Sequence, residues 1–350
     1  MRASSVTISE KPLLRVLNGE CLNPRPIWFM RQAGRYLPDY LKIRNKVGNF
    51  LDLCYTPELA TEITLQPIKR FQLDAAILFS DILVIPHGLG QKVTFEKGQG
   101  PILEPIKDIK QINRLDLARA EDHLNPVYRA IEYVRAGLPR KTSLIGFAGA
   151  PWTVAAYMIQ GGGHSQFSDF ISFSKSQPKE LSVLIDKLTI ATTNHLLKQI
   201  DAGVDVVQIF DSWCNIAADS FFDKFCVLPL KKIVSELKQK HPKLPIIGFP
   251  RGCGPRLIDY VDGSGLGAVS LDHLMSLGWA NKTLSSNITI QGNLDPNLLF
   301  ADDVRLGGGA KRIMDVLRGR PHIFNLGHGV HKDTDPERVK FLVEFVRAYE

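Results

Sequence analysis

The chain has 350 residues, of which 44% are apolar and 23% charged, close to the averages of globular proteins. This length suits one α/β barrel with insertions, and two domains of ordinary size are the alternative. Lysine and arginine (43) outnumber aspartate and glutamate (36), so the net charge is +7. Such a charge favours an anionic ligand, but the basic residues are dispersed and form no run typical of a nucleic-acid-binding arm. We therefore expect no nucleic-acid partner.

Five cysteines are present without a CxxC pair, which argues against a disulfide framework and against a four-thiolate zinc site. This usage indicates a reducing, cytoplasmic environment. The amino terminus lacks the apolar core of a signal peptide, and no stretch approaches the ~20 apolar residues of a membrane span. We expect a cytoplasmic protein with no membrane partner, whose first eleven or so residues are flexible.

Short apolar runs bounded by turn residues recur along the chain and predict eight strands. Most are too apolar to be half-exposed, as expected of strands in an all-parallel sheet. The predicted strands are Pro26–Met30, Ala75–Phe79, Leu144–Phe147, Val204–Phe210, Pro245–Phe249, Ala268–Leu271, Ile288–Ile290 and His322–Asn325.

Helical patterns separate these strands. Thr56-Pro57-Glu58 is typical of a helix start, apolar residues at helical spacing run from Leu181 until Gly203, and a last helix begins at Asp335-Pro336. Eight alternations of strand and helix predict a single (β/α)8 TIM barrel over residues 1–350. Residues 81–142 and 211–243 are predicted to be insertions in its βα loops.

Polar residues follow the predicted strands, where barrel enzymes carry their catalytic loops. The clearest group is Arg31 and Arg35, which flank Gln32, Ala33 and Gly34. Small residues there let the backbone approach a ligand, and two guanidinium groups can bind carboxylates. Arg44 can add a third cation. The alternative is that each arginine pairs with a protein carboxylate such as Asp39 or Glu58, and two arginines on one turn favour a ligand.

Aspartates follow the second, fourth and sixth strands. Asp272 and the later Asp295 are each interpreted as the N-cap of the next helix. Asp211 has two possible roles, to orient Ser212 or to cap the helix that follows it. Asp81 differs, because the following Ile-Leu-Val-Ile-Pro makes a poor helix start. Its carboxylate is therefore expected to face the mouth of the barrel.

Residues 146–164 form a strand end, a tight turn and a helix, without either phosphate-binding glycine motif. Glycines 161–163 are partly explained as a helix C-cap, and Tyr157 is equally compatible with a ligand contact and with the core. His328 is the histidine best placed for a site. His331 lies nearby, but no third ligand stands at suitable spacing, so no metal is expected.

Six segments together resemble the uroporphyrinogen decarboxylases of haem biosynthesis, in register from about residue 12 to the end. They are MRQAGRY (30–36), FSDIL (79–83), GFAGAPWT (146–153), FDSW (210–213), QGNLDP (291–296) and NLGHG (325–329). Gln160 departs from the family pattern, which often has glutamate there, and the loop Pro250–Gly254 is less diagnostic.

The resemblance implies a homodimer of (β/α)8 barrels that converts uroporphyrinogen III to coproporphyrinogen III by removing four acetate carboxyl groups as CO2. It implies no metal and no organic cofactor. It places substrate contacts at Arg31, Ala33, Arg35, Arg44, Asp81, Tyr157, Ser212 and His328, with Gln32 and Gly34 in the same turn. Asp81 would accept hydrogen bonds from the pyrrole N–H groups, and Arg31, Arg35 and Tyr157 are the further candidates for catalysis.

Two other functions are alternatives to this one. The first is a zinc-dependent, corrinoid-linked methyltransferase of the same superfamily, whose sequence pattern resembles His-x-Cys after a middle strand with a later cysteine. In this chain the corresponding Arg251-Gly252-Cys253 lacks the histidine, and His328 occupies the later loop. A non-catalytic tetrapyrrole-binding or nucleic-acid-binding protein is the other. Neither explains the whole set of segments.

Overall fold

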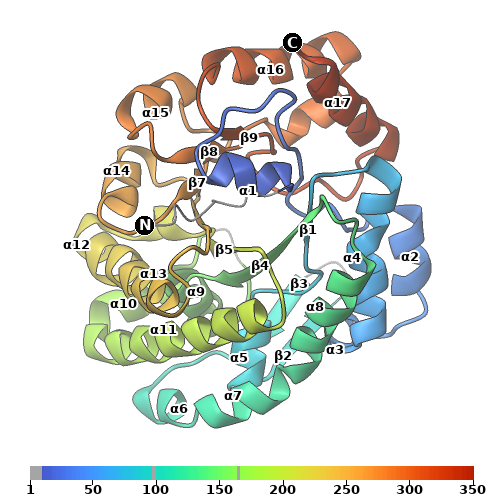
Figure 1. The fold of residues 1–350 in the computed structure, drawn as a ribbon. Helices are drawn as coiled ribbons and strands as arrows, with labels where there is room; N and C mark the ends of the chain where they lie inside the picture. Colours follow the sequence, from blue (N-terminus) through green and yellow to red (C-terminus); the bar gives the residue numbers. More distant parts are fainter. Residues whose placement is uncertain (1–9, 97–99, 164–165) are drawn as a thin grey trace, which may run out of the picture.

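A parallel sheet of seven strands forms the centre of the molecule (Figure 1). The computed structural model describes residues 10–96, 100–163 and 166–350. The strands pair in the order β1-β4-β5-β6-β7-β8-β9, so each neighbours the next along the chain. They are β1 Ala75–Ile77, β4 Ser143–Gly149, β5 Val206–Asp211, β6 Ile246–Pro250, β7 Ala268–Ser270, β8 Thr289–Gln291 and β9 His322–Ile323. Seven of the eight predicted strands are thereby confirmed.

The first predicted strand, residues 26–30, is not a regular strand. Ile27 forms a single parallel bridge with Phe324, and its carbonyl accepts the N–H of Asp74, which precedes β1. Side chains replace regular backbone partners: the Ile27 N–H donates to an Asp74 carboxylate oxygen, and the Met30 N–H to Asn325 Oδ1. The segment therefore lies between β9 and β1, although the ladder is broken.

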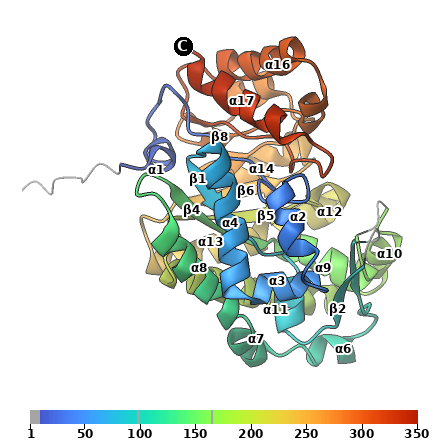
Figure 2. The same cartoon turned by 90° about the vertical axis from the view of Figure 1, so that its right-hand side faces the viewer.

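Helices cover the outside of the curled sheet, as Figure 2 shows for α2, α4 and α8. This arrangement buries both faces of the strands, which explains their apolar sequences. The α-helices are α1 Pro12–Leu17, α2 Pro38–Arg44, α3 Phe50–Tyr55, α4 Pro57–Phe71, α5 Val84–Gly88, α6 Ile109–Asn113, α7 Leu117–His123, α8 Asn125–Gly137, α9 Pro151–Gln160, α10 Ser168–Ser176, α11 Pro178–Asp201, α12 Asp219–Phe222, α13 Leu228–Lys240, α14 Leu257–Val261, α15 Leu277–Thr283, α16 Asp303–Val316 and α17 Pro336–Ala348.

The predicted helix boundaries agree closely with these bounds. The helix expected up to Gly203 is α11, and Asp335 caps α17 by accepting the N–H of Glu337. Gly161 ends α9 in a left-handed conformation (φ 81°) and donates to the Tyr157 carbonyl, as predicted for a C-cap. Thr56 precedes α4, but its hydroxyl donates to the Asp52 carbonyl instead of capping.

Side chains fill the interior of the curled sheet, and α1 lies across it (Figure 1). Leu13, Val16 and Leu17 of α1 belong to the same buried cluster as Trp28 and residues of β1, β4, β5, β6, β7 and β9. Thr289 of β8 donates its hydroxyl to the Val16 carbonyl. The helix therefore covers the end of the sheet opposite the functional loops.

The excursion after residue 81 contains an antiparallel hairpin that the sequence pattern did not predict. It pairs β2 (Val93–Glu96) with β3 (Gly100–Leu103), and Ile102 also bridges to Gly162 after α9. Among the described residues, no helix is long and apolar enough to cross a membrane.

Candidate active site

The predicted site residues lie on loops that leave the carboxyl ends of separate parallel strands. Asp81 follows β1, Ser212 follows β5 and His328 follows β9, while Tyr157 lies on α9 after β4. Because parallel strands end at the same edge of a sheet, these loops converge. Residues 31–35 join them from the segment between β9 and β1.

Arg31 occupies a left-handed backbone conformation, with φ 58°, which is uncommon for a residue with a side chain. Such a conformation costs of order 1–3 kcal/mol and persists only where surrounding contacts impose it. Gln32 supplies these contacts, because its buried amide accepts the Phe29 N–H and donates to the Ala75 carbonyl. The Gln32 side chain is thus committed to the protein and holds the turn in place.

The turn at Arg31 is fastened to the loop that follows β9. Val330 donates its N–H to the Met30 carbonyl at 2.9 Å, and Gly329 lies directly against the Arg31 side chain. A Cβ on Gly329 would stand 2.6 Å from Arg31 Cγ, so only glycine leaves room. The first and last loops of the site therefore form one packed unit.

Arg31 and Arg35 take part in no ion pair among the described residues, and no hydrogen bond from their guanidinium groups is formed there. The alternative that they pair with a protein carboxylate is not supported, since Asp39 pairs with Lys42 at 2.9 Å. Arg44 is less free, because its guanidinium donates to the Val47 carbonyl at 2.7 Å. The charges of Arg44 and Arg35 both act on the pKa of Tyr40, which lies on α2 beside them.

Asp81 begins a tight turn, and the expectation of a poor helix start after it is wrong. One carboxylate oxygen accepts the Leu83 N–H at 2.8 Å, and α5 begins at Val84. Pro86 is tolerated because it lies in the first turn of α5, where backbone N–H groups have no partner within the helix. The other carboxylate oxygen has no hydrogen-bond partner in the described chain.

The Asp81 carboxyl is half-buried, and loss of solvent raises its pKa to about 6. The hydrogen bond from Leu83 and the charge of Arg31 both oppose this shift. Asp81 therefore carries a negative charge near neutral pH in surroundings of low polarity. That combination suits the stabilisation of a transient cation.

Tyr157 is half-buried, and burial raises the pKa of its phenol. The indole N–H of Trp213 close to its hydroxyl and the charges of Arg31 and Arg251 lower that pKa in part, whereas Asp81 raises it. Its ring centroid lies 6.5 Å from that of Trp213. Of the two interpretations of Tyr157, this position beside Asp81 and Arg31 favours a ligand contact. Ser212, half-buried next to Trp213, forms no hydrogen bond with a described residue.

Asp211 neither orients Ser212 nor caps a helix. Its buried carboxylate accepts the Thr153 hydroxyl at 2.6 Å, and the same hydroxyl accepts the Trp213 N–H at 3.0 Å. Burial raises the Asp211 pKa to about 7. Through the Thr153 hydroxyl, Asp211 therefore holds the backbone of Trp213 in place.

The other two aspartates serve their own loops. Asp272 accepts the N–H groups of Gly252 and Leu274, which makes an Asx turn and a link between two loops where a helix cap was expected. Asp295 accepts the Asn297 N–H and caps a 3₁₀ turn, Pro296–Phe300, so its interpretation as a cap is confirmed.

His328 is held as a neutral imidazole. Its Nδ1 accepts the Gly329 N–H at 2.7 Å, and burial together with Arg31, Arg251 and His273 lowers its pKa to about 3. The proton must then be on Nε2, which has no partner among the described residues and is available as a donor. His331 instead lies near Asp333.

Two further residues, Arg251 and His273, belong to this constellation. Arg251, which follows β6, lies with its guanidinium carbon 5.5 Å from the centre of the Trp213 ring. His273, which follows β7, contributes to lowering the His328 pKa, and its buried Nδ1 has no hydrogen-bond partner among the described residues. A cation or histidine directly after a strand was the available signal, but the loop sequences alone did not say where the side chains point.

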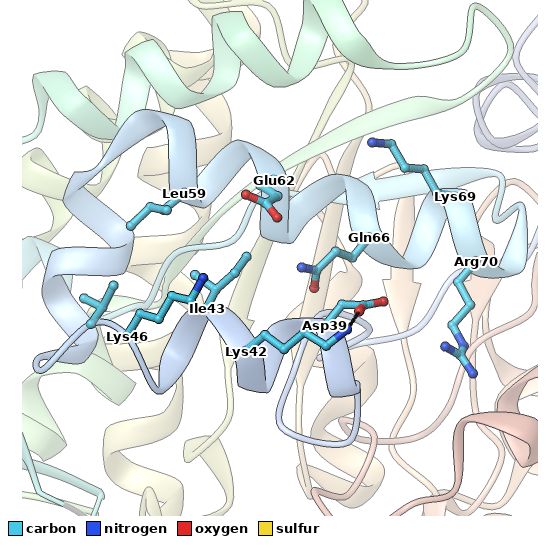
Figure 3. A pocket seen from close by; sticks show the side chains of 10 residues that line it. Asp39, Lys42, Ile43, Lys46, Leu59, Glu62, Gln66, Lys69 and Arg70 are labelled. Carbon is cyan, nitrogen blue, oxygen red and sulfur yellow. Dashed lines mark hydrogen bonds and ion pairs between the residues drawn. The ribbon is translucent and has the colours of Figure 1, made fainter.

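A groove of about 590 Å³ lies elsewhere, between α2 and α4 (Figure 3). Lysines and acidic residues line it together, including Lys42, Lys46, Glu62 and Lys69. None of the predicted site residues lines this groove, which lies between two helices of the outer layer. The groove is therefore not part of the candidate active site. No group of three or more histidine, cysteine, aspartate or glutamate side chains in the described chain is arranged to hold a metal ion.

Comparison with known proteins gives a consistent result. A family model described as "Uroporphyrinogen decarboxylase (URO-D)" matches residues 9–349. The uroporphyrinogen decarboxylase of Rhodospirillum rubrum is 44% identical over 340 residues, which cover 97% of this chain and 98% of that protein. The uroporphyrinogen decarboxylase of a Chelativorans species is 47% identical, with coverage of 97% and 99%.

Solved structures match at the level of the fold. A methyltransferase from Methanosarcina mazei superposes with a TM-score of 0.79, at 20% identity, over 97% of this chain and 98% of its own. A B12-independent methionine synthase from a Shewanella species superposes with a TM-score of 0.52 at 12% identity.

Proposed function

The chain belongs to the uroporphyrinogen decarboxylase family, and from this premise we propose that it converts uroporphyrinogen III to coproporphyrinogen III by releasing four CO2 molecules. The substrate would carry eight carboxylates, four of which are removed. Arg31 and Arg35, which form no ion pair with a described residue, would bind and orient carboxylates. Gln32, Ala33 and Gly34 shape the turn between them, and Arg44 would add positive charge beside it.

The chemistry needs little from a cofactor. Protonation of a ring carbon turns a pyrrole into a cation that can accept the electron pair released as the C–C bond to CO2 breaks. The exocyclic methylene left behind takes up a proton to become a methyl group, and the ring carbon returns its proton. Each cycle therefore consumes one proton per CO2. The protein's part is to stabilise the cation and to supply protons.

Asp81 would supply that stabilisation, with its free carboxylate oxygen toward the pyrrole N–H groups. The observation that carries this proposal is that Arg31 lies close enough to Asp81, Tyr157 and His328 for its charge to lower the pKa of each, although the four residues come from separate segments of the chain. A preorganised carboxylate of raised pKa costs no reorganisation when the cation forms. Ser212 and the Nε2–H of His328 would hydrogen-bond substrate groups at the rim.

We also propose that the sheet closes into a single (β/α)8 barrel over residues 1–350, with residues 26–30 as the eighth strand. The bridge from Ile27 to Phe324 and the hydrogen bond from Asp74 to the Ile27 carbonyl support this closure. A homodimer and a cytoplasmic location are further proposals, which follow from the family resemblance and from five free cysteines.

Anaerobic incubation of the purified protein with uroporphyrinogen III, with and without a chelator, tests the function. Formation of coproporphyrinogen at equal rates in both samples is the expected result. Loss of turnover in the chelator, restored by zinc, would contradict a metal-free reaction. No turnover in either sample, together with stoichiometric bound zinc, would instead favour the methyltransferase alternative. No turnover in either sample, despite tight porphyrinogen binding, would indicate a binding protein.

A further inference from the structure

Arg251 is held rigidly at the carboxyl end of β6. Its N–H donates to the Asp211 carbonyl at 3.1 Å, and its carbonyl accepts the thiol of Cys214 at 3.1 Å. The next N–H, that of Gly252, donates to the Asp272 carboxylate at 2.8 Å. Loops after three neighbouring strands thus fix the backbone from which the Arg251 side chain leaves.

Trp213 provides a platform for the guanidinium group of Arg251. The guanidinium carbon lies 5.5 Å from the ring centre, within the range of a cation–π contact. The indole is itself fixed, by its backbone bond to Thr153 and by packing on Phe167 at 4.6 Å between ring centres. No side-chain hydrogen bond or ion pair of Arg251 is formed with a described residue, so its five N–H donors are open to a ligand.

The two arginines reach the site from different loops. Arg251 follows β6 and lies over the Trp213 ring, whereas Arg31 precedes β1 and packs against Gly329, which follows β9. Burial lowers the pKa of His328 and the charges of both arginines lower it further, while the charge of Arg31 also lowers the pKa of Asp81. Two such arginines, neither of them in an ion pair with a described residue, can hold two carboxylates of one large ligand.

We propose that Arg251 is a substrate-positioning residue that binds a carboxylate which the substrate retains through all four decarboxylations. The inference rests on the proposed function, because only a polycarboxylate ligand needs a second arginine that forms no ion pair with the described protein. Its cation–π contact with Trp213 limits where the guanidinium can lie. The fork of the guanidinium can form a bidentate bond to one carboxylate. The ligand would then turn about this fixed point less freely, and each acetate would be presented in a defined position.

Arg251→Met, Arg251→Lys and the surface variant Arg305→Met test the proposal. Arg305→Met removes the same charge from an exposed position on α16, where the side chain forms an ion pair with Asp302, and is expected to behave as wild type. For each protein, KM and kcat with uroporphyrinogen III and the Kd of coproporphyrinogen are measured under anaerobic conditions. Loss of a charge-assisted bond is expected to raise both the KM and the product Kd about 10- to 100-fold in Arg251→Met.

The product measurement distinguishes the retained from the removed carboxylates. A raised KM with an unchanged product Kd would mean that Arg251 binds an acetate, and would overturn the proposal. Unchanged values for both ligands would overturn it as well. Arg251→Lys is expected to lie between wild type and Arg251→Met, since it keeps the charge but not the fork. If wild type itself fails to turn over uroporphyrinogen, the proposed function is at fault, whatever the variants bind.

Discussion

Gly329 and Arg31 lie in direct contact across the seam between the last and first loops of the site. A Cβ on Gly329 would stand 2.6 Å from Cγ of Arg31, while the backbone of Arg31 is itself in a left-handed conformation. The position of the Arg31 guanidinium group therefore depends on the absence of a side chain at Gly329, about 300 residues later in the chain. No ion pair with a described residue holds the group.

Gly329→Ala is expected to displace the Arg31 side chain and to lower kcat/KM about 10- to 100-fold, because small displacements of an orienting group have effects of this size. Steady-state kinetics with uroporphyrinogen III measure it. Gly308→Ala is the matched control, since Gly308 lies on α16 with open space around it. That control should keep full activity and gain about 0.5–1 kcal/mol of stability. Equal kinetics for both variants would contradict the contact.

Asp81→Asn is expected to lower kcat by at least 10²- to 10³-fold, because an amide cannot stabilise the pyrrole cation by charge. The substitution removes a negative charge from low-polarity surroundings, so the free energy of unfolding should not fall. Single-turnover rates measure the first effect, and denaturant unfolding the second. Coproporphyrinogen should still bind, and turnover within a few-fold of wild type would refute the role of Asp81.

The pH dependence follows from the same carboxyl group. Its pKa is raised to about 6, so Asp81 is ionised above pH 6 and loses its charge below it. We expect kcat/KM to fall on the acidic side with an apparent pKa close to 6, since this ratio reports on the free enzyme. His328, with a pKa lowered to about 3, stays neutral through this range. The residual activity of Asp81→Asn should lack the acidic limb, and persistence of the same limb would assign it to another group.

His195 offers a test of stability away from the site. It is buried on α11, its Nδ1 shares a hydrogen bond with the Tyr128 hydroxyl at 3.0 Å, and burial lowers its pKa to about 3. An unfolded histidine gains its proton near pH 6.5, whereas the folded one does not, so its contribution is present above pH 6.5 and is lost as the pH falls toward 3.

His195→Gln should therefore make stability less dependent on pH. Between pH 7 and pH 5 the wild type is expected to lose about 2 kcal/mol more unfolding free energy than the variant. Urea unfolding at the two pH values measures this difference of differences. Glutamine can still accept the Tyr128 hydroxyl. Parallel losses in both proteins would mean that the folded histidine takes up the proton.

The sequence predicted the parallel strands and main helices well, because burial on both faces and caps such as Asp335 leave local signatures. It did not reveal the β2–β3 hairpin, whose strands are short and only half-buried. It also missed the helix after Asp81, since α5 has only five residues and no side-chain cap that would mark its start.

The residues of the candidate site were likewise predicted only in part. Loop position after a strand indicated Arg31, Asp81 and His328, and these lie together. The stacking of Arg251 on Trp213 joins loops after different strands, and no local pattern encodes such a contact. Whether the ten predicted site residues bind substrate stays a prediction for the variants above.

Helix α1 limits where substrate can enter and products can leave the enzyme. Because its leucines and Val16 seal one end of the sheet's interior together with Trp28, the floor offers no passage. Substrate arrival, four departures of CO2 and product release are then expected at the carboxyl ends of the strands, where Arg31 and Arg251 lie. A macrocycle that loses its acetates one after another has to be reoriented there or released and bound again. How often partly processed intermediates escape into solution thus depends on how firmly the rim holds them.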